Sequence, residues 1–490
     1  MENNMSQRGY NQMMELLKEA LLEDNMVLDS YYQTKKLVRS LGLPVEKIDC
    51  CESGCMLYWG DDEHLTCCTF CGHERYKHRV GSRKMKLVPY KKMYYFPLIP
   101  RLQRLYASPA TTADMRWHHE HTKEDGVMRH PSDSEAWKHF NESHHFFAVE
   151  PRNVRLGLCT DGFQPFSQSG SKYSSWPVIV TPYNLPPRMC MKEAYMFLTV
   201  IVPGPTNPKH KIDVYLQPLI KELTLLWETG VEAFDISKKQ NFQLRAALMW
   251  TISDFPAYSM LSGWSTTGNL ACPYCMEETQ SFRLKHGRKT SWFDCHRMFL
   301  DQNHPFRRDR KNFCKGKTVQ RSSPPYRTGA ELLNQICDLG IRKVTELDAN
   351  EVNRRLCKSC GWKKKSIFWD LPYWSSNMIR RNLDVMHIEK NVFDNVFNTV
   401  LNFDDKTKDN PQSRQDMVEY CDRPQLAKDS SGKYPKVVYT IDKETRAILF
   451  NWVKGLRFPD GYVSNLGRCP DTNAKRIFGM KSHNCHVFMQ

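Results

Sequence analysis

The sequence has no run of 18 consecutive apolar residues, which is about the length that a helix needs to cross a bilayer. Its polar first residues, 1–4, are not followed by the apolar core of a secretory signal peptide. It also has no internal repeat. These absences argue against a membrane protein, a secreted protein and a repeat protein. They predict a chain that stays in the cytosol or nucleus, without a membrane partner.

Cysteine, by contrast, is frequent, with 18 among 490 residues. Because thiols are kept reduced in the cytosol and nucleus, we do not expect these residues to form disulfides. Cysteines that recur in pairs at short spacing are better explained as metal ligands. The composition is otherwise that of a folded protein of two to four domains, with 40% hydrophobic and 25% charged residues.

Two cysteine pairs near the N-terminus have the spacing of a zinc ribbon. They are Cys51-x3-Cys55 and Cys68-x2-Cys71. Two thiolate pairs on turns close a tetrahedral Zn²⁺ site, and the metal then folds a segment too short for a core of its own. The neighbouring Cys50 and Cys67 leave each choice open by one residue. The alternative is a set of buried cysteines without a metal.

The charge balance favours a polyanionic partner. Lys and Arg number 70 and Asp and Glu 54, which gives a net charge of +16 and a pI of about 9.0. Each phosphate that such a surface neutralises releases counterions, and this favours nucleic acid. The densest basic runs are Arg79–Arg104, Arg307–Lys317 and Lys363–Lys365.

The basic runs have two explanations that the sequence leaves open. They track DNA phosphates, with Tyr90, Tyr94 and Tyr95 stacking on unpaired bases, or they are solvated faces. Arg307–Lys311 also fits the weak pattern of a nuclear localisation signal.

The order of apolar runs after residue 153 predicts an α/β fold. Three strands, a helix and a fourth run are expected at 154–159, 176–181, 195–203, 214–229 and 242–252. Periodicity alone allows the fourth run to be strand or helix. With a strand there, the order is that of the ribonuclease-H-like fold. A further helix is predicted at 381–401.

Three acidic residues stand where such a fold would place catalytic carboxylates. Asp161 and Asp254 follow the first and fourth runs, and Glu389 lies in the later helix. Cleavage of phosphodiesters uses two divalent ions held by carboxylates, and Mg²⁺ suits this because it keeps positions open for water and phosphate. From spacing alone, helix-capping or solvated carboxylates are the more common explanation.

Long motifs around these residues resemble the plant CACTA (En/Spm-type) transposases, from about Lys47 to Gln490. Among them are Asp161-Gly-Phe-Gln-Pro-Phe, Tyr215-Leu-Gln-Pro-Leu-Ile, Asp254-Phe-Pro-Ala-Tyr, Cys272-Pro-Tyr-Cys275, Leu371-Pro-Tyr-Trp and Asn382-Leu-Asp-Val-Met-His-Ile-Glu-Lys-Asn391. The resemblance implies a DDE-type catalytic core in which Asp161, Asp254 and Glu389 hold Mg²⁺ or Mn²⁺. Asp384 and His387 lie on the same stretch as Glu389 and compete with it.

The resemblance also implies a second zinc site in an insertion after Asp254. Related DDE recombinases place a CxxC there, which is Cys272 and Cys275, and complete the site with histidines. His296 and His304 are the nearest matches. His286 and the pair Cys357 and Cys360 are competitors.

The expected function is DNA transposition: nicking of element ends, then attack of the freed 3′-hydroxyls on target DNA. The expected partners are double-stranded DNA (terminal repeats and target) and further copies of the chain assembled on it, in the nucleus. One alternative is a domesticated or truncated derivative that binds DNA without cleaving it. Another is a zinc-ribbon adaptor, which does not account for the carboxylates.

The expected organisation follows from these assignments. A ribonuclease-H-like catalytic domain with a zinc-containing insertion is preceded by a small zinc-ribbon-like module. The six parts are a helical segment (1–46), the zinc-ribbon-like module (47–80), a basic linking and DNA-binding segment (81–152), the catalytic domain (153–403, insertion at about 265–365), a linker (404–436) and the truncated start of a C-terminal domain (437–490).

Overall fold

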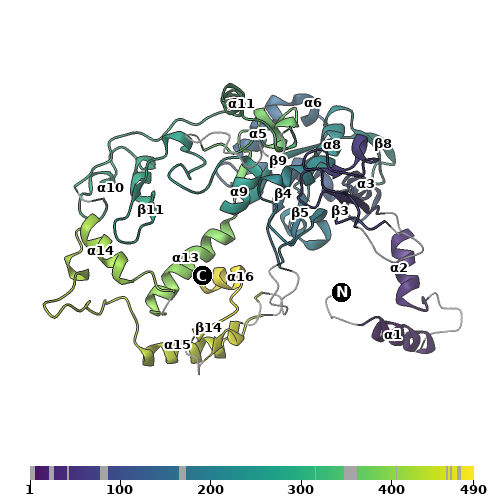
Figure 1. Ribbon diagram of the computed structural model, residues 1–490. Coiled ribbons are helices and arrows are strands. Elements are labelled where there is room, and N and C mark those ends of the chain that lie inside the picture. The colour runs from purple at the N-terminus through teal and green to yellow at the C-terminus, as the bar shows by residue number, and fades with distance from the viewer. Residues whose placement is uncertain are drawn as a thin grey trace. The chain divides into compact units, whose positions relative to one another are not determined.

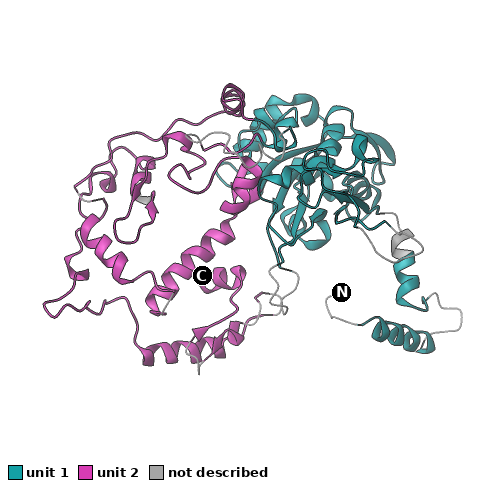
Figure 2. Ribbon diagram, viewed as in Figure 1, with its two compact units in different colours: residues 1–251, 342–353, 366–380 teal, residues 252–341, 354–365, 381–490 magenta. Residues whose placement is uncertain are grey.

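The computed structural model has two compact units (Figures 1 and 2). Unit 1 comprises residues 1–251, 342–353 and 366–380, and unit 2 the remaining residues, 252–341, 354–365 and 381–490. The structure describes residues 6–20, 27–40, 43–77, 87–164, 173–314, 316–346, 361–403, 406–459, 462–463, 466–471 and 476–489. Arg79, Lys315, Cys357, Cys360 and the expected boundary at residue 80 lie outside these ranges.

A large mixed sheet organises the described α/β fold. Its eight strands have the order β12-β9-β4-β5-β6-β3-β1-β2. The strands are β1 Glu46–Cys50, β2 Leu57–Tyr58, β3 Lys91–Tyr95, β4 Val154–Thr160, β5 Trp176–Pro182, β6 Phe197–Val202, β9 Ala246–Ser253 and β12 Arg381–Leu383.

The centre of the sheet is the part that the sequence predicted best. β4, β5 and β6 form an antiparallel meander in which Leu158 pairs with Val180 and Val178 with Val200. Most residues of β4 are buried, including Arg155 and Gly157 between its apolar residues. The three predicted strands are confirmed.

The fourth predicted run is a strand, and it lies beside the first. The start of this strand, β9, lies next to the start of β4: the Val154 amide donates a hydrogen bond to the Arg245 carbonyl at 2.8 Å. The first residues of β4 and β9 are therefore neighbours, and the two strands run in the same direction. The first residues of the predicted run, 242–244, instead belong to β8 (Gln240–Leu244), which forms a hairpin with β7 (Val231–Asp235).

The long helix α8 (Ile212–Glu228) confirms the helix predicted at 214–229. From this helix, Glu222 accepts hydrogen bonds from the amides of Leu98 at 2.8 Å and Ile99 at 2.9 Å. These amides lie at the start of α3 (Ile99–Ala107). There the Glu222 carboxylate accepts from N–H groups that have no partner within the helix, and its negative charge interacts favourably with the helix dipole. Glu222 thereby ties the basic stretch after β3 to the core.

The cysteine-rich segment is joined to the large sheet. β1 pairs with β3 along all five of its residues, and β3 pairs with β6. The pairing is antiparallel, so the strands on either side of the cysteines extend the meander. The sequence predicted a small module at this place but not its attachment.

Several short helices lie between residues 114 and 148, within the predicted linking and DNA-binding segment (81–152). α5 (Glu135–Ser143) buries Trp137 and Phe140. Arg155 from β4 is also buried, and its guanidinium lies 4.9 Å from the Trp137 ring centre and donates to Asn141 at 2.6 Å. Further α-helices in the described part of unit 1 are α1 Gln7–Ala20, α2 Tyr31–Ser40, α4 Trp117–Glu120, α6 His145–Ala148 and α7 Pro187–Cys190.

The regular elements described in unit 2 are mainly helices. The predicted helix at 381–401 is wrong at its start: the chain forms β12 first, and Asp384 then caps α13 (Val385–Val400). The expected linker contains α14 (Pro411–Tyr420). The other α-helices and strands among the described residues of this unit are α9 Phe255–Ser262, β10 Phe282–Arg283, β11 Thr290–Ser291, α10 Pro305–Arg308, α11 Gly329–Asp338, α15 Lys443–Gly455, β13 Pro470–Asp471, β14 Arg476–Ile477 and α16 Ser482–Met489. Among the described helices of both units, none is long and apolar enough to cross a membrane.

Candidate functional site

Four cysteine sulfurs come together beside strands β1 and β2. The ligand atoms of Cys51, Cys55, Cys68 and Cys71 all lie within 4.8 Å of one another. Two tight turns present them: the Gly54 amide donates to the Cys51 carbonyl, and the Gly72 amide to the Cys68 carbonyl, each at 2.8 Å. Both glycines have φ of +69°, which other residues rarely adopt. Four sulfur donors in this arrangement suit a tetrahedral Zn²⁺ ion.

The two alternative cysteines do not belong to this cluster. Cys50 is the last residue of β1, and its thiol donates to the Ile48 carbonyl at 3.4 Å. Cys51 directly follows the strand, at the start of the turn in which the Gly54 amide donates to its carbonyl. Cys67 is exposed, whereas Cys68 is buried. A hydrogen bond from the Cys55 thiol lowers the pKa of Cys51, which favours the thiolate form that binds metal.

A second cluster lies after α9 in unit 2. Cys272, Cys275 and His296 have ligand atoms within 4.8 Å of one another. Burial raises the pKa of Cys272, but hydrogen bonds from His296 and the backbone outweigh burial and lower it to about 7. Among the described residues, the Nε2 atom of His296 is buried and has no hydrogen-bond partner. A buried nitrogen of this kind is costly unless a ligand engages it.

The other residues considered for this cluster have different surroundings. His304 caps α10, where its Nδ1 accepts from the Phe306 amide at 3.2 Å. His286 Nε2 is 3.0 Å from a Glu419 carboxylate oxygen. The structure therefore brings His296 to the cysteine pair but not His304.

We expect His296→Asn to lower the zinc content by one ion per chain, because it removes a ligand that the cysteine pair requires. His304→Asn is the matched control and should keep full zinc content. Cys272→Ser should likewise release this zinc, because it removes one of the two thiolates of the cluster. Metal analysis of the purified chains measures the first effect. Full zinc content in His296→Asn would contradict the assignment.

The predicted carboxylates are distributed over both units. Asp161, in unit 1, directly follows β4 and is exposed, and its Oδ1 accepts from the Gly162 amide at 2.6 Å. Asp254, in unit 2, directly follows β9 and is partly exposed. Its Oδ1 accepts from the Ala257 amide at 2.9 Å and so caps α9. Helix capping, the common alternative to catalysis, is thus one role of Asp254.

Two acidic residues compete for the third position, and unit 2 places them differently. The Asp384 amide donates to the Ser253 carbonyl at 3.0 Å, so its backbone lies beside the residue that precedes Asp254. The Asp384 carboxylate caps α13 and lies 2.7 Å from His387 Nδ1. Glu389 lies one turn further along α13, where its Oε2 is 2.6 Å from His486 Nδ1 of α16. Sequence reasoning missed His486, because only the packing of α16 on α13 reveals it.

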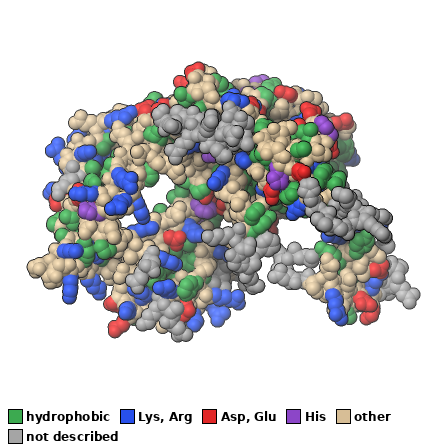
Figure 3. All heavy atoms as spheres, viewed as in Figure 1, with side chains coloured by type: hydrophobic (Ala, Val, Ile, Leu, Met, Phe, Trp, Pro, Cys, Tyr) green, Lys and Arg blue, Asp and Glu red, His purple; other side chains and the backbone are tan. Residues whose placement is uncertain are grey.

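Several residues of the basic runs are structural. Tyr95 is 4% exposed and its hydroxyl donates to Glu222, so the prediction that it stacks on DNA bases is wrong. Arg307 is 2% exposed and donates to four backbone carbonyls, and Lys364 is fully buried. Tyr94 remains partly exposed. Other Lys and Arg side chains are frequent on the visible face of unit 2 (Figure 3).

Comparison with protein families supports one class of protein for this chain, the transposases. The model that matches is described as transposase family tnp2, and it covers residues 125–339. That range contains Asp161, Asp254 and the second cluster, but not the first cluster or Glu389. A comparison with curated proteins found no match.

Proposed function

We propose that the protein is a CACTA-type DDE transposase that cuts the ends of a transposable element and joins them to target DNA. The observation that carries the proposal is the family match over residues 125–339, because this range contains both aspartates and the second cluster, Cys272, Cys275 and His296. The motifs around Asp161, Asp254 and Glu389 point to the CACTA type within this class. We infer that double-stranded DNA is the partner and the nucleus the compartment.

The topology supports a ribonuclease-H-like core. A meander of β4, β5 and β6 is followed by α8 and then by β9, which lies beside β4 in the same direction. Asp161 and Asp254 each come directly after a strand of this sheet. Glu389 stands on the helix that follows β12. This is the order of carboxylates that the DDE proposal requires.

The donor chemistry of these residues fits Mg²⁺ or Mn²⁺, since carboxylate oxygens are the ligands that both ions prefer. None of the three carboxylates is buried, so ions and DNA can reach them. In the proposed scheme Asp161, Asp254 and Glu389 hold the ions. When bound, the ions stabilise negative charge on the attacking and leaving oxygens.

The proposed reaction has two steps. Water attacks the phosphorus at an element end, the P–O3′ bond breaks, and the products are a 3′-hydroxyl and a 5′-phosphate. The 3′-hydroxyl then attacks a phosphorus of target DNA, and a 3′-hydroxyl of the target leaves. No Ser or Tyr nucleophile is required. Because two element ends must be joined in one event, we infer that copies of the chain assemble on DNA.

The test is cleavage of a DNA duplex that carries CACTA-type ends. We expect the purified chain to nick it at the ends in Mg²⁺ or Mn²⁺ and not in EDTA, because the carboxylates act only through bound ions. Gel analysis of end-labelled strands measures both the position and the rate. DNA binding without metal-dependent nicking would instead indicate a derivative that binds DNA but has lost its chemistry.

A further inference from the structure

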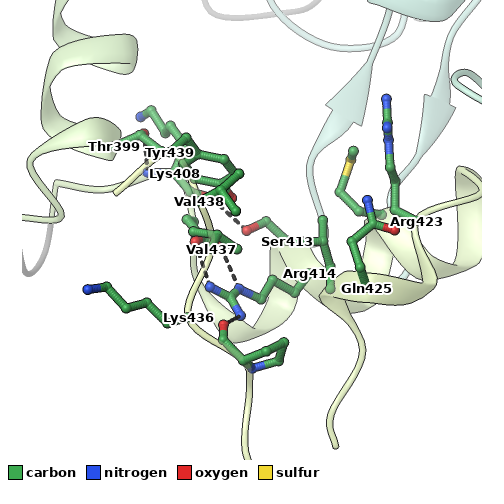
Figure 4. A pocket seen from close by; sticks show the side chains of 14 residues that line it. Thr399, Lys408, Ser413, Arg414, Arg423, Gln425, Lys436, Val437, Val438 and Tyr439 are labelled. Atoms are coloured by element: carbon green, nitrogen blue, oxygen red, sulfur yellow. Dashed lines mark hydrogen bonds and ion pairs between the residues drawn. The ribbon is translucent and has the colours of Figure 1, made fainter. Parts of the chain in front are cut away.

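A cavity of about 730 Å³ lies within unit 2, between the end of α13, α14 and residues 435–439 (Figure 4). Its volume is in the range of pockets that enclose a small organic ligand. It includes none of the predicted carboxylates or cysteines. The sequence predicted only a polar linker over most of this region.

One wall of the cavity is held in place by an ion pair. Arg414 on α14 makes two bonds to Asp409, at 2.6 and 2.7 Å, and a third to the Pro435 carbonyl at 2.7 Å. Bidentate pairing of this kind fixes the guanidinium in one orientation. The segment that follows Pro435 is thereby held against α14.

The cavity presents apolar and aromatic surface to solvent. Val438 is fully exposed, Tyr439 is 42% exposed and Met417 is 37% exposed. Burial and the neighbouring Asp409 carboxylate raise the pKa of Tyr439, so its ring is neutral at physiological pH. An exposed valine and tyrosine beside each other favour a flat apolar group as the occupant.

Cations surround this apolar surface. Lys408, Arg423 and Lys436 line the cavity, and in the described part of the chain none of them makes an ion pair. Arg423 and Lys436 lie on opposite sides of the view in Figure 4. The one acidic lining residue, Asp409, is neutralised by Arg414. The lining therefore carries an excess of positive charge.

We infer that this cavity binds an unpaired nucleotide of a DNA strand, with the base on Tyr439 and Val438 and the flanking phosphates on Lys408, Arg423 and Lys436. The inference rests on the proposed function for the identity of the polyanion. A nucleotide combines a flat aromatic group with a phosphate, which matches the apolar surface and its cationic rim. Paired bases inside a duplex do not expose such a face.

The experiment is fluorescence anisotropy with two labelled DNAs that share one duplex, one blunt and one with a short single-stranded 3′ tail. We expect the full chain to prefer the tailed DNA, and Tyr439→Ala to weaken tailed binding about tenfold or more while blunt binding is unchanged. Tyr439→Phe keeps the ring and should keep the preference. Trp452→Ala, an exposed aromatic on α15 outside the cavity, is the matched control.

Charge is tested in the same assay. Lys436→Glu should weaken tailed binding and reduce its salt dependence, whereas Lys443→Glu on α15 should have a much smaller effect. Equal binding of both DNAs by the unaltered chain, or a preference that survives Tyr439→Ala, would overturn the inference. Either result leaves metal-dependent nicking unaffected, so it is distinct from failure of the proposed function. A chain that neither binds nor nicks DNA overturns both.

Discussion

Replacement of Cys68 with serine is expected to release one zinc ion per chain and to unfold the segment around β2. The cluster of four sulfurs leaves no spare ligand among the described residues nearby. Structural zinc contributes about 10–16 kcal/mol of apparent free energy in small zinc-dependent peptides, so loss of one thiolate removes a large part of the local stability. Metal analysis and thermal unfolding measure the two effects.

The neighbouring cysteine provides the control for this experiment. Cys67→Ser changes an exposed residue outside the cluster and should leave zinc content and unfolding temperature unchanged. Zinc loss in Cys67→Ser but not in Cys68→Ser would mean that Cys67, one residue earlier, is the ligand. If both variants retained all their zinc and their stability, the assignment of a metal to this cluster would be wrong.

Replacement of Asp161 with asparagine is expected to lower the rate of DNA nicking at least about a thousandfold. A metal ion contributes several kcal/mol of charge stabilisation to phosphoryl transfer, and about 1.4 kcal/mol corresponds to a tenfold change in rate. Asparagine keeps the size of the side chain but not its charge. Asp338→Asn, an exposed change on α11, should nick at the unaltered rate. Nicking by Asp161→Asn at that same rate would remove Asp161 from the proposed chemistry.

The same assay identifies the third carboxylate. Glu389→Gln removes the charge while keeping an oxygen toward His486, and we expect it to abolish nicking. Asp384→Asn should be nearly silent, because asparagine caps a helix about as well as aspartate. The reverse result would assign the metal to Asp384, whose amide bonds to the residue before Asp254.

The sequence predicted the elements whose signals are local. The strands at β4, β5 and β6 and the helix α8 follow from runs of apolar residues with clear periods. The run that became β9 was ambiguous, because a buried strand and a buried helix are both continuously apolar. The run is a strand because it pairs with β4, and this pairing is a tertiary contact that local sequence does not show.

Features that depend on distant contacts were not predictable. The residues around Tyr95 in the sequence do not indicate that its hydroxyl bonds to Glu222, which is distant in the chain. The residues around Glu389 likewise do not indicate its contact with His486. The choice between Cys50 and Cys51 depends on where β1 ends and the turn begins, and the spacing of the cysteines does not encode that point. Arg307 stands in a basic run that favours phosphate binding, but its guanidinium donates its hydrogen bonds to backbone carbonyls.

The edge of the large sheet has a consequence for how the chain behaves in solution. β2 has only two residues and covers β1 only at Asp49 and Cys50. Bare strand edges pair with other chains and lead to aggregation. The turns between Cys51 and Cys71 flank β2 on both sides. We therefore expect a chain without metal at the four cysteines to expose this edge of the sheet and to form insoluble assemblies.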